Sequence, residues 1–227
     1  DAERVEVLRG PQGAHYGRNA VGGAINVVTK EPGNDLSGFV SGGYASGDAI
    51  DLAAGISGPL VKDVVLFRVA ATYKQADGQI ENDFRGDKVD FVDHDYSIRG
   101  RLLIKPGGPL TIDLRAQYGE YRAGSNYYSA IFSGDPNDFV NPQFNLPGSS
   151  DGKSTDLTAK LDYDFGFATL TSTTGYTNFK QKIRADLDFR NPIDSPDGFN
   201  NLGFQLGQGQ NQKIETVSQE LGLVSAT

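Results

Sequence analysis

The stretch that decides the fold is ERVEVLRGPQGAHYGRNAVGGAINVVTKEP, residues 3–32. It opens with a short alternating run at residues 4–8 and closes with a second β-rich run at residues 22–29. Arg9, Gly10 and Pro11 end the first run, and glycine is frequent in the segment that follows. The pattern predicts two short strands joined by a glycine-rich crossing.

Beyond Pro32 the sequence alternates between apolar and polar residues with a period of two, which places one set of side chains on each face of a strand. Eight such runs are predicted, at residues 39–45, 49–58, 64–75, 96–105, 110–118, 156–163, 168–183 and 213–225. Short connections at 59–63, 106–109 and 165–167 alternate with long ones at 76–95, 121–153 and 186–210. The sequence therefore predicts an all-β antiparallel meander with its tight turns at one end and its long loops at the other.

The charge and composition exclude several classes of function. A net charge of −8 disfavours a nucleic-acid partner, because nucleic acids select a basic surface. Residues 76–95 alone hold seven acids and two bases, so the acidity is concentrated in predicted loops. Cysteine is absent and there are two histidines, so neither a metal site nor a cofactor is expected. No nucleophile has a histidine base nearby, and we expect a protein that is not an enzyme.

The tyrosines favour a membrane barrel over a soluble protein. Tyr44, Tyr73, Tyr96, Tyr118, Tyr163 and Tyr176 lie near strand ends, in phase with the apolar residues of their strands. Such a girdle is typical of the interfaces of a transmembrane barrel, where short periplasmic turns also face long extracellular loops. A soluble β-sandwich binding module, in which the tyrosines cap a core, is the alternative.

Two short motifs carry little functional information. Gly152-Lys153-Ser154 resembles a phosphate-binding loop, but the spacing fails because Pro147 stands where the first glycine is required. Asp93-His94-Asp95 contains metal-ligand types, but neighbours along an extended chain point to opposite faces. We interpret it as part of an acidic loop.

Two other groups are candidates for binding. The aromatic residues Tyr121, Tyr127, Tyr128 and Phe132 lie in a predicted long loop, where they either contact a ligand or fasten the loop to its neighbours. Glu220 lies on the polar face of the last predicted strand, and Arg9 lies at the break of the opening stretch. These two are either an ion pair between a barrel wall and something inside it, or separately solvated charges.

The opening stretch resembles the end of the plug domain of TonB-dependent outer-membrane receptors. The residues that carry this resemblance are Arg9, Gly10, Pro11, Tyr16, Gly17, Arg18, Gly22, Gly23 and Asn26, within the runs ERVEVLRGP, YGRNA and GGAINVVTK. The following strands, together with Ser218-Gln219-Glu220-Leu221, resemble more loosely the early barrel of the iron-complex, or siderophore, branch of that family. His15 departs from the apolar or hydroxyl residue that the pattern leads us to expect.

The resemblance implies a fragment, with residues 1–31 as the C-terminal part of a plug and residues 32–227 as the first eight strands of a larger barrel. It implies an outer-membrane location in a Gram-negative bacterium, a scarce nutrient such as a ferric siderophore as ligand, and uptake by plug movement. Outer-membrane lipid and the TonB complex would be partners, although the short N-terminal box that TonB contacts is not in this sequence. By itself the piece would form an open sheet with exposed edges. A passive porin-like channel is a further alternative, against which the plug motif counts.

Overall fold

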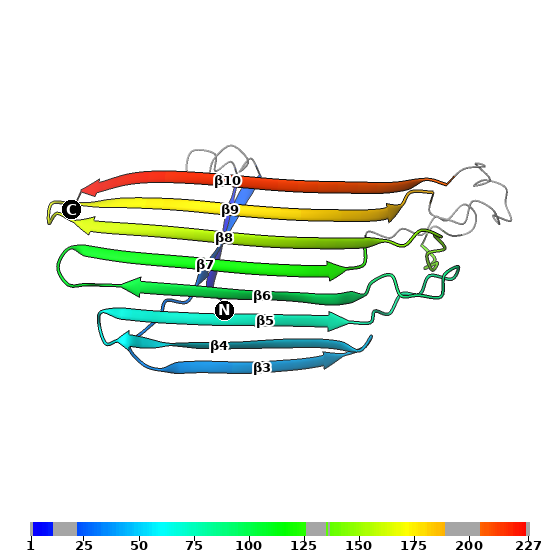
Figure 1. The fold of residues 1–227 in the computed structure, drawn as a ribbon, viewed down its shortest axis with the longest axis horizontal. Helices are drawn as coiled ribbons and strands as arrows, with labels where there is room; N and C mark the ends of the chain where they lie inside the picture. Colours follow the sequence, from blue (N-terminus) through cyan, green and yellow to red (C-terminus); the bar gives the residue numbers. More distant parts are fainter. Residues whose placement is uncertain (1, 11–21, 126–134, 136, 189–204, 226–227) are drawn as a thin grey trace.

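The computed structural model of the chain describes residues 2–10, 22–125, 135, 137–188 and 205–225. Within them, ten β-strands form a two-stranded and an eight-stranded antiparallel sheet (Figure 1). The strands are β1 (Ala2–Arg9), β2 (Gly23–Thr29), β3 (Ser37–Ala45), β4 (Ala49–Val61), β5 (Val65–Ala76), β6 (Val92–Ile104), β7 (Leu110–Ala123), β8 (Ser149–Asp164), β9 (Ala168–Asp186) and β10 (Gly207–Ser225). None of the described segments is a helix of the length and apolarity that crossing a membrane requires.

The opening stretch forms the predicted pair of strands. β1 and β2 are antiparallel, with Glu6 opposite Asn26 and Arg9 opposite Gly23. Gly10 and Gly23 have φ angles of 84° and 135°, in the region that favours glycine. A Cβ atom on Gly23 would lie 2.3 Å from the carbonyl oxygen of Leu8, whereas one on Gly22 would meet open space. The hairpin therefore requires glycine at position 23.

Substitution of Gly23 tests this requirement. We expect Gly23→Ala to destabilise the β1–β2 hairpin by about 1–3 kcal/mol, because it adds a strained φ angle and a clash with the β1 backbone. Hydrogen exchange of the β1 and β2 amides in the whole protein would report the loss as faster exchange. Gly22→Ala is the matched control and should leave these rates unchanged; equal effects at both positions would contradict the assignment.

The eight-stranded sheet is a meander in which every strand pairs with its neighbour in sequence, from β3 to β10. The connections 62–64, 105–109 and 165–167 lie at one end, here called the turn end. The connections 77–91, 124–148 and 187–206 lie at the other, here called the loop end, on the right in Figure 1. Within the described residues β3 and β10 are unpaired edges, so the sheet is open as expected.

The strands extend further toward the loop end than the alternation predicts. β6 begins at Val92 instead of residue 96, β7 continues to Ala123, and β8 begins at Ser149 instead of residue 156. The added residues are polar on both faces of the sheet, for example the neighbours Lys153 and Ser154 on β8. The hydrophobic period therefore disappears while the backbone pairing continues. The long loops are correspondingly shorter than predicted.

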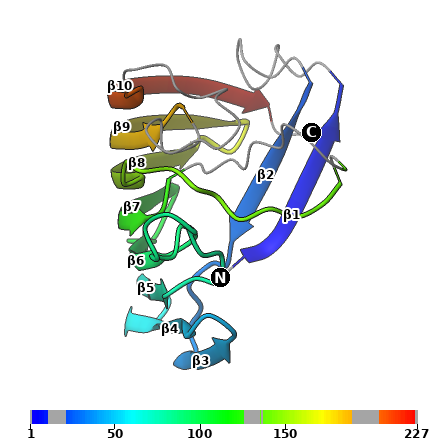
Figure 2. The ribbon, with the colours of Figure 1, turned by 90° about the vertical axis from the view of Figure 1, so that its right-hand side faces the viewer.

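The two faces of the sheet differ sharply. One face, the outer face, carries exposed apolar side chains on every strand, among them Ile98 (50% exposed), Leu157 (47%) and Leu161 (42%). The other face, the inner face, carries polar residues, and the β1–β2 hairpin stands on this side of the sheet (Figure 2). No second sheet packs on the apolar face within the described residues. This arrangement differs from a soluble sandwich, in which the apolar face would be the core.

All six tyrosines of the predicted girdle lie on the outer face. Tyr73 and Tyr96 are directly paired across β5 and β6, and Tyr118 opposes Ile98 on β6. Tyr163 lies near the turn end, where its ring centroid is 4.7 Å from that of Phe165. The outer face therefore has aromatic residues toward both ends of its apolar band.

Candidate functional site

A cluster of charges, in which Arg101 and Asp113 are buried, joins the inner face of the sheet to the end of the hairpin. This inner-face cluster consists of Arg101 on β6, Asp113 and Arg115 on β7, and Glu31 just after β2. The short 105–109 turn sets the register that places Arg101 opposite Arg115. Asp113 lies on β7 two residues before Arg115, on the same face of the sheet. From there its carboxylate reaches the guanidinium groups of both Arg101 and Arg115.

The geometry of the inner-face cluster is that of a shared bidentate pair. Arg101 donates to both carboxylate oxygens of Asp113, with Nε 3.1 Å from Oδ1 and Nη2 2.9 Å from Oδ2. Arg115 Nη2 lies 2.7 Å from the same Oδ2. The Arg101 and Asp113 side chains are 8% and 7% exposed, whereas that of Arg115 is 45% exposed. Charges so far removed from water are stable only because each has its partner.

Arg101 also holds the chain where it leaves the hairpin. Its Nη2 donates to Glu31 Oε1 at 2.8 Å, and its Nη1 lies 3.4 Å from the carbonyl oxygens of Thr29 and of Lys30. A second attachment lies three residues further along the chain. There Asn34 Nδ2 donates to Asp63 Oδ1 at 2.6 Å, and the backbone N–H of Asp63 donates to Asn34 Oδ1 at 2.7 Å. The segment between β2 and β3 is thus anchored to the sheet at two points. Between the hairpin and the sheet lies a cavity of about 560 Å³, lined by Arg4, Val28 and Arg115 among others.

The hairpin has a polar ladder of its own. Asn26 Nδ2 donates to Glu6 Oε2 at 2.9 Å, and Arg4 Nε donates to Glu6 Oε1 at 2.6 Å. The hydrogen bond from Arg4 lowers the pKa of the Glu6 carboxyl below its usual value, and the bond from Asn26 acts in the same direction. Asn26, selected from the sequence as a motif residue, therefore links the two strands.

The other predicted residues of the opening stretch are less informative. Arg9 ends β1, and Glu220 lies on β10 opposite Thr173 of β9. Their ion pair stays a prediction. Pro11, Tyr16, Gly17 and Arg18 lie outside the described residues.

At the loop end, parts of two connections pack into a small ordered unit, here called the loop unit (residues 77–91 and 137–148). Asn82 is completely buried; its Nδ2 donates to the carbonyl oxygen of Phe144 at 2.8 Å. Its Oδ1 accepts from the backbone N–H groups of Phe84 at 3.0 Å and Arg85 at 3.2 Å. Asp90 accepts from the backbone N–H of Ile80 at 2.8 Å. Acidic and amide side chains here satisfy the loop backbone, a role the sequence did not reveal.

The predicted aromatic ligand surface is placed differently. Tyr121 lies not in a loop but in β7, on the inner face, where its ring covers Gly152 of β8. Its hydroxyl accepts a 2.7 Å hydrogen bond from Gln181 Nε2. Tyr127, Tyr128 and Phe132 lie outside the described residues. Phe84 and Phe139, which are 50% and 75% exposed, are apolar groups that the loop unit presents to solvent.

The two weak sequence motifs have structural positions. Gly152, Lys153 and Ser154 lie inside β8, so they form no phosphate-binding loop. His94 contacts Asp93, with Nδ1 3.2 Å from Oδ2, and its ring centroid lies 5.8 Å from that of Tyr96, with the two rings tilted by 32°. In the described part of the chain no group of three or more His, Cys, Asp or Glu side chains is arranged to hold a metal ion.

Comparison with known proteins supports one class. No family model matches the chain. A probable TonB-dependent siderophore receptor, PirA of Acinetobacter baumannii, is 38% identical over 82 residues, covering 33% of this chain and 11% of the relative. The ferric enterobactin receptor PirA of Pseudomonas aeruginosa is 30% identical over 174 residues, a match that covers 72% of this chain and 23% of that relative. The crystal structure of the ferric-catecholate import receptor Fiu of E. coli K12, in its open form, superposes with a TM-score of 0.75 at 16% sequence identity. The superposition covers 99% of this chain and 36% of the Fiu chain.

The fold and these matches define an outer-membrane receptor. The eight-stranded sheet matches part of the barrel of a TonB-dependent receptor. The chain belongs to the TonB-dependent siderophore receptor family, whose members are outer-membrane receptors of Gram-negative bacteria and not enzymes. It spans about a third of the solved receptors, and between 11% and 23% of these two relatives.

Proposed function

We propose that residues 1–31 are the C-terminal part of a plug and residues 32–227 the first strands of the barrel of a receptor that imports a ferric siderophore. The observation that carries this proposal is the position of the β1–β2 hairpin. It stands on the polar inner face and is joined to the wall through Arg101, while the apolar face is left exposed on the other side. A plug inside a barrel whose outside contacts lipid requires this arrangement.

In this proposal the exit segment is the fixed end of a movable plug. Arg101 holds the chain at Thr29, Lys30 and Glu31, and Asn34 holds it again at Asp63. Transport would then move the hairpin while residues 29–34 stay on the wall.

The ligand class rests on the relatives and on the loop end. The matched relatives include a ferric enterobactin receptor and a probable siderophore receptor. With the first barrel strand starting at the periplasm, the loop unit lies outside the cell. Its exposed Phe84 and Phe139 offer apolar contact area, which aromatic ligands such as catecholates can use.

Iron uptake by cells that carry the full-length receptor as their only siderophore receptor tests the function. We expect accumulation of radioactive iron from at least one ferric siderophore, and its loss when TonB is deleted. The passive porin-like alternative predicts uptake that is independent of TonB. Either TonB-independent uptake, or no uptake from catecholate, hydroxamate and mixed-ligand siderophores, would contradict the proposal.

A further inference from the structure

We propose that the connections at the loop end form one rim, which keeps its shape while the receptor captures and passes its ligand. This loop-end rim consists of the β3–β4 turn (46–48), the loop unit, residues 124–125 just after β7, and residues 187–188 and 205–206 between β9 and β10. It extends the loop unit to its neighbours on both sides. The inference rests on the proposed function, because it concerns what stays fixed during transport.

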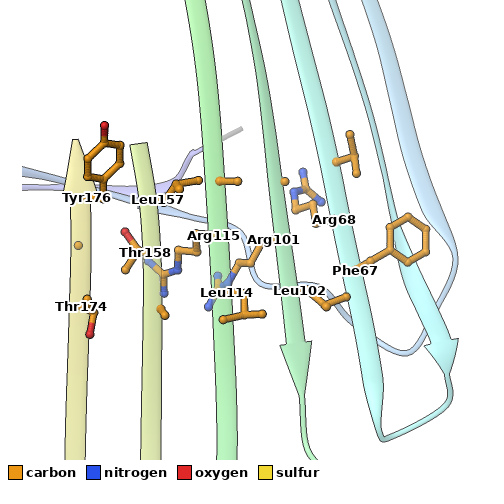
Figure 3. Close-up of a pocket in the computed structure, with 15 residues that line it drawn as sticks. Phe67, Arg68, Arg101, Leu102, Leu114, Arg115, Leu157, Thr158, Thr174 and Tyr176 are labelled. Carbon is orange, nitrogen blue, oxygen red and sulfur yellow. The ribbon is translucent and has the colours of Figure 1, made fainter. Parts of the chain in front are cut away.

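The sheet itself does not fix the positions of these connections. Within the described residues it is a single layer, with no second sheet on its outer face. On that face Leu102, Leu114 and Leu157 line an open hollow of about 570 Å³ that extends over β5 to β9, as Figure 3 shows. The arrangement of the connections therefore depends on the contacts that they make with one another.

The first of these contacts joins the β3–β4 turn to the loop unit. The backbone N–H groups of Asp77 and Gly78 donate to the carbonyl oxygen of Gly47 at 2.8 and 3.3 Å. Gln79 Nε2 donates to the carbonyl oxygen of Ser46 at 3.3 Å. Gly47 has a φ angle of 79°, and a Cβ atom there would lie 3.0 Å from the carbonyl oxygen of Gly78. The two backbones are thus in direct contact.

The second contact joins the loop unit to the chain that leaves β7. The backbone N–H of Gly124 donates to the carbonyl oxygen of Phe91 at 2.8 Å. A Cβ atom at Gly124 would overlap the carbonyl oxygen of Val89, whose side chain is buried. Two backbones packed this closely cannot shift past one another without separating.

The third contact joins the loop unit to the connection between β9 and β10. The backbone N–H of Leu146 donates to Asp186 Oδ2 at 3.0 Å, at the end of β9. Just beyond it, the N–H of Leu187 donates to the carbonyl oxygen of Leu206 at 2.9 Å. The N–H of Leu206 in turn donates to Asp188 Oδ2 at 3.0 Å. The hydrogen-bonded rim therefore reaches from the β3–β4 turn to the start of β10.

Contacts in series make the loop-end rim a cooperative unit. A connection that moves alone must break its contacts with its neighbours, whereas the rim breaks none of them when it moves as one body. Two of the side chains that carry these contacts, Asn82 and Asp186, are 0% and 6% exposed, so water does not replace their partners. We therefore expect the rim to open as one unit. A ligand then meets a preformed surface over the described part of the loop end.

Hydrogen exchange of the full-length receptor in detergent tests this cooperativity without any ligand. Gly124→Ala strains the contact with Val89 and leaves the other contacts of the rim in place. We expect exchange to be about tenfold faster at the amides of Asp77, Leu146 and Leu187 alike, because one overpacked contact weakens the whole unit to which it belongs.

Gly43→Ala, near the loop end of β3, is the matched control. Its Cβ atom would lie 3.9 Å from that of Asp51, an ordinary contact, and we expect these rates to change less than twofold. Acceleration that is confined to residues 77–91, or that does not occur at all in Gly124→Ala, would overturn the inference.

A reversible crosslink tests the loop-end rim during transport. Asp83 and Asn141 come from the two segments of the loop unit and are joined by a 2.9 Å hydrogen bond, and this sequence contains no cysteine. Asp83→Cys/Asn141→Cys, joined by a short bis-methanethiosulfonate reagent, fixes the two segments at their present separation. We expect iron uptake from ferric catecholate, hydroxamate and mixed-ligand siderophores to change less than twofold on crosslinking. Asp83→Cys alone, treated with the same reagent, is the control.

Loss of uptake in the crosslinked receptor, restored by a reducing agent, would overturn the inference, because the two segments would then have to separate during transport. If Gly124→Ala prevents folding, the crosslink still decides. A receptor that imports no iron even without the crosslink contradicts the proposed function, and hydrogen exchange then decides whether the rim is one body.

Discussion

Arg101→Ala should destabilise the full-length receptor by about 3–5 kcal/mol, the cost of removing one partner of a buried ion pair. The substitution leaves the Asp113 carboxylate, which is 7% exposed, with Arg115 alone. It also releases Glu31 and the carbonyl oxygens of Thr29 and Lys30. Urea unfolding of the receptor in detergent micelles would measure the loss of stability.

The neighbouring arginine supplies the matched control. Arg115→Ala removes a guanidinium that binds the same carboxylate, but its side chain is 45% exposed. Water screens that interaction, so we expect a cost of at most about 1 kcal/mol. If Arg101→Ala and Arg115→Ala had equal effects, burial would not be what makes Arg101 important. Faster hydrogen exchange at residues 29–31 in the Arg101 variant alone would show that this residue anchors the exit segment.

The strands were predictable from the sequence because a half-buried strand shows its period directly. All eight runs of alternation became strands of one meander, and the opening stretch became a hairpin. The prediction failed at the loop ends, where both faces of a strand are polar and only backbone pairing remains. Tyr121 was therefore assigned to a loop although it lies in β7.

Only some contacts of the inner-face cluster could have been predicted from the sequence. The short turn between β6 and β7 implies that Arg101 and Arg115 are cross-strand neighbours. Counting from that turn would also have placed Asp113 on the same face, one pair of residues closer to the turn. Glu31 could not be assigned, because it lies in an irregular segment 70 residues from Arg101 in the chain. The loop unit has no periodic signal at all, since Asn82 and Phe144 meet across 62 residues of sequence.

Asn82→Ala should cost about 3 kcal/mol or more in the stability of the loop unit, with little effect on the sheet. The side chain is fully buried, and its removal leaves two backbone N–H groups and the carbonyl oxygen of Phe144 without their partner. Each buried polar group left unpaired costs about 1–3 kcal/mol. We expect hydrogen exchange and limited proteolysis to increase at residues 77–91 and 137–148, while the amides of β4 to β9 stay protected.

Two further variants distinguish the effect of the buried Asn82 side chain from that of an exposed hydrogen bond between the same two loop segments. Asn141→Ala removes the exposed 2.9 Å hydrogen bond to Asp83 between the same two segments, and should cost less than about 1 kcal/mol. Asn82→Asp keeps an acceptor for the N–H groups of Phe84 and Arg85 but loses the donor to Phe144, so it should release mainly residues 137–148. Release of both segments to the same extent by all three variants would show that Asn82 is not the centre of the unit. If Asn82 is that centre, the acidic loop end is a folded surface, and its exposed Phe84 and Phe139 keep fixed positions for a ligand.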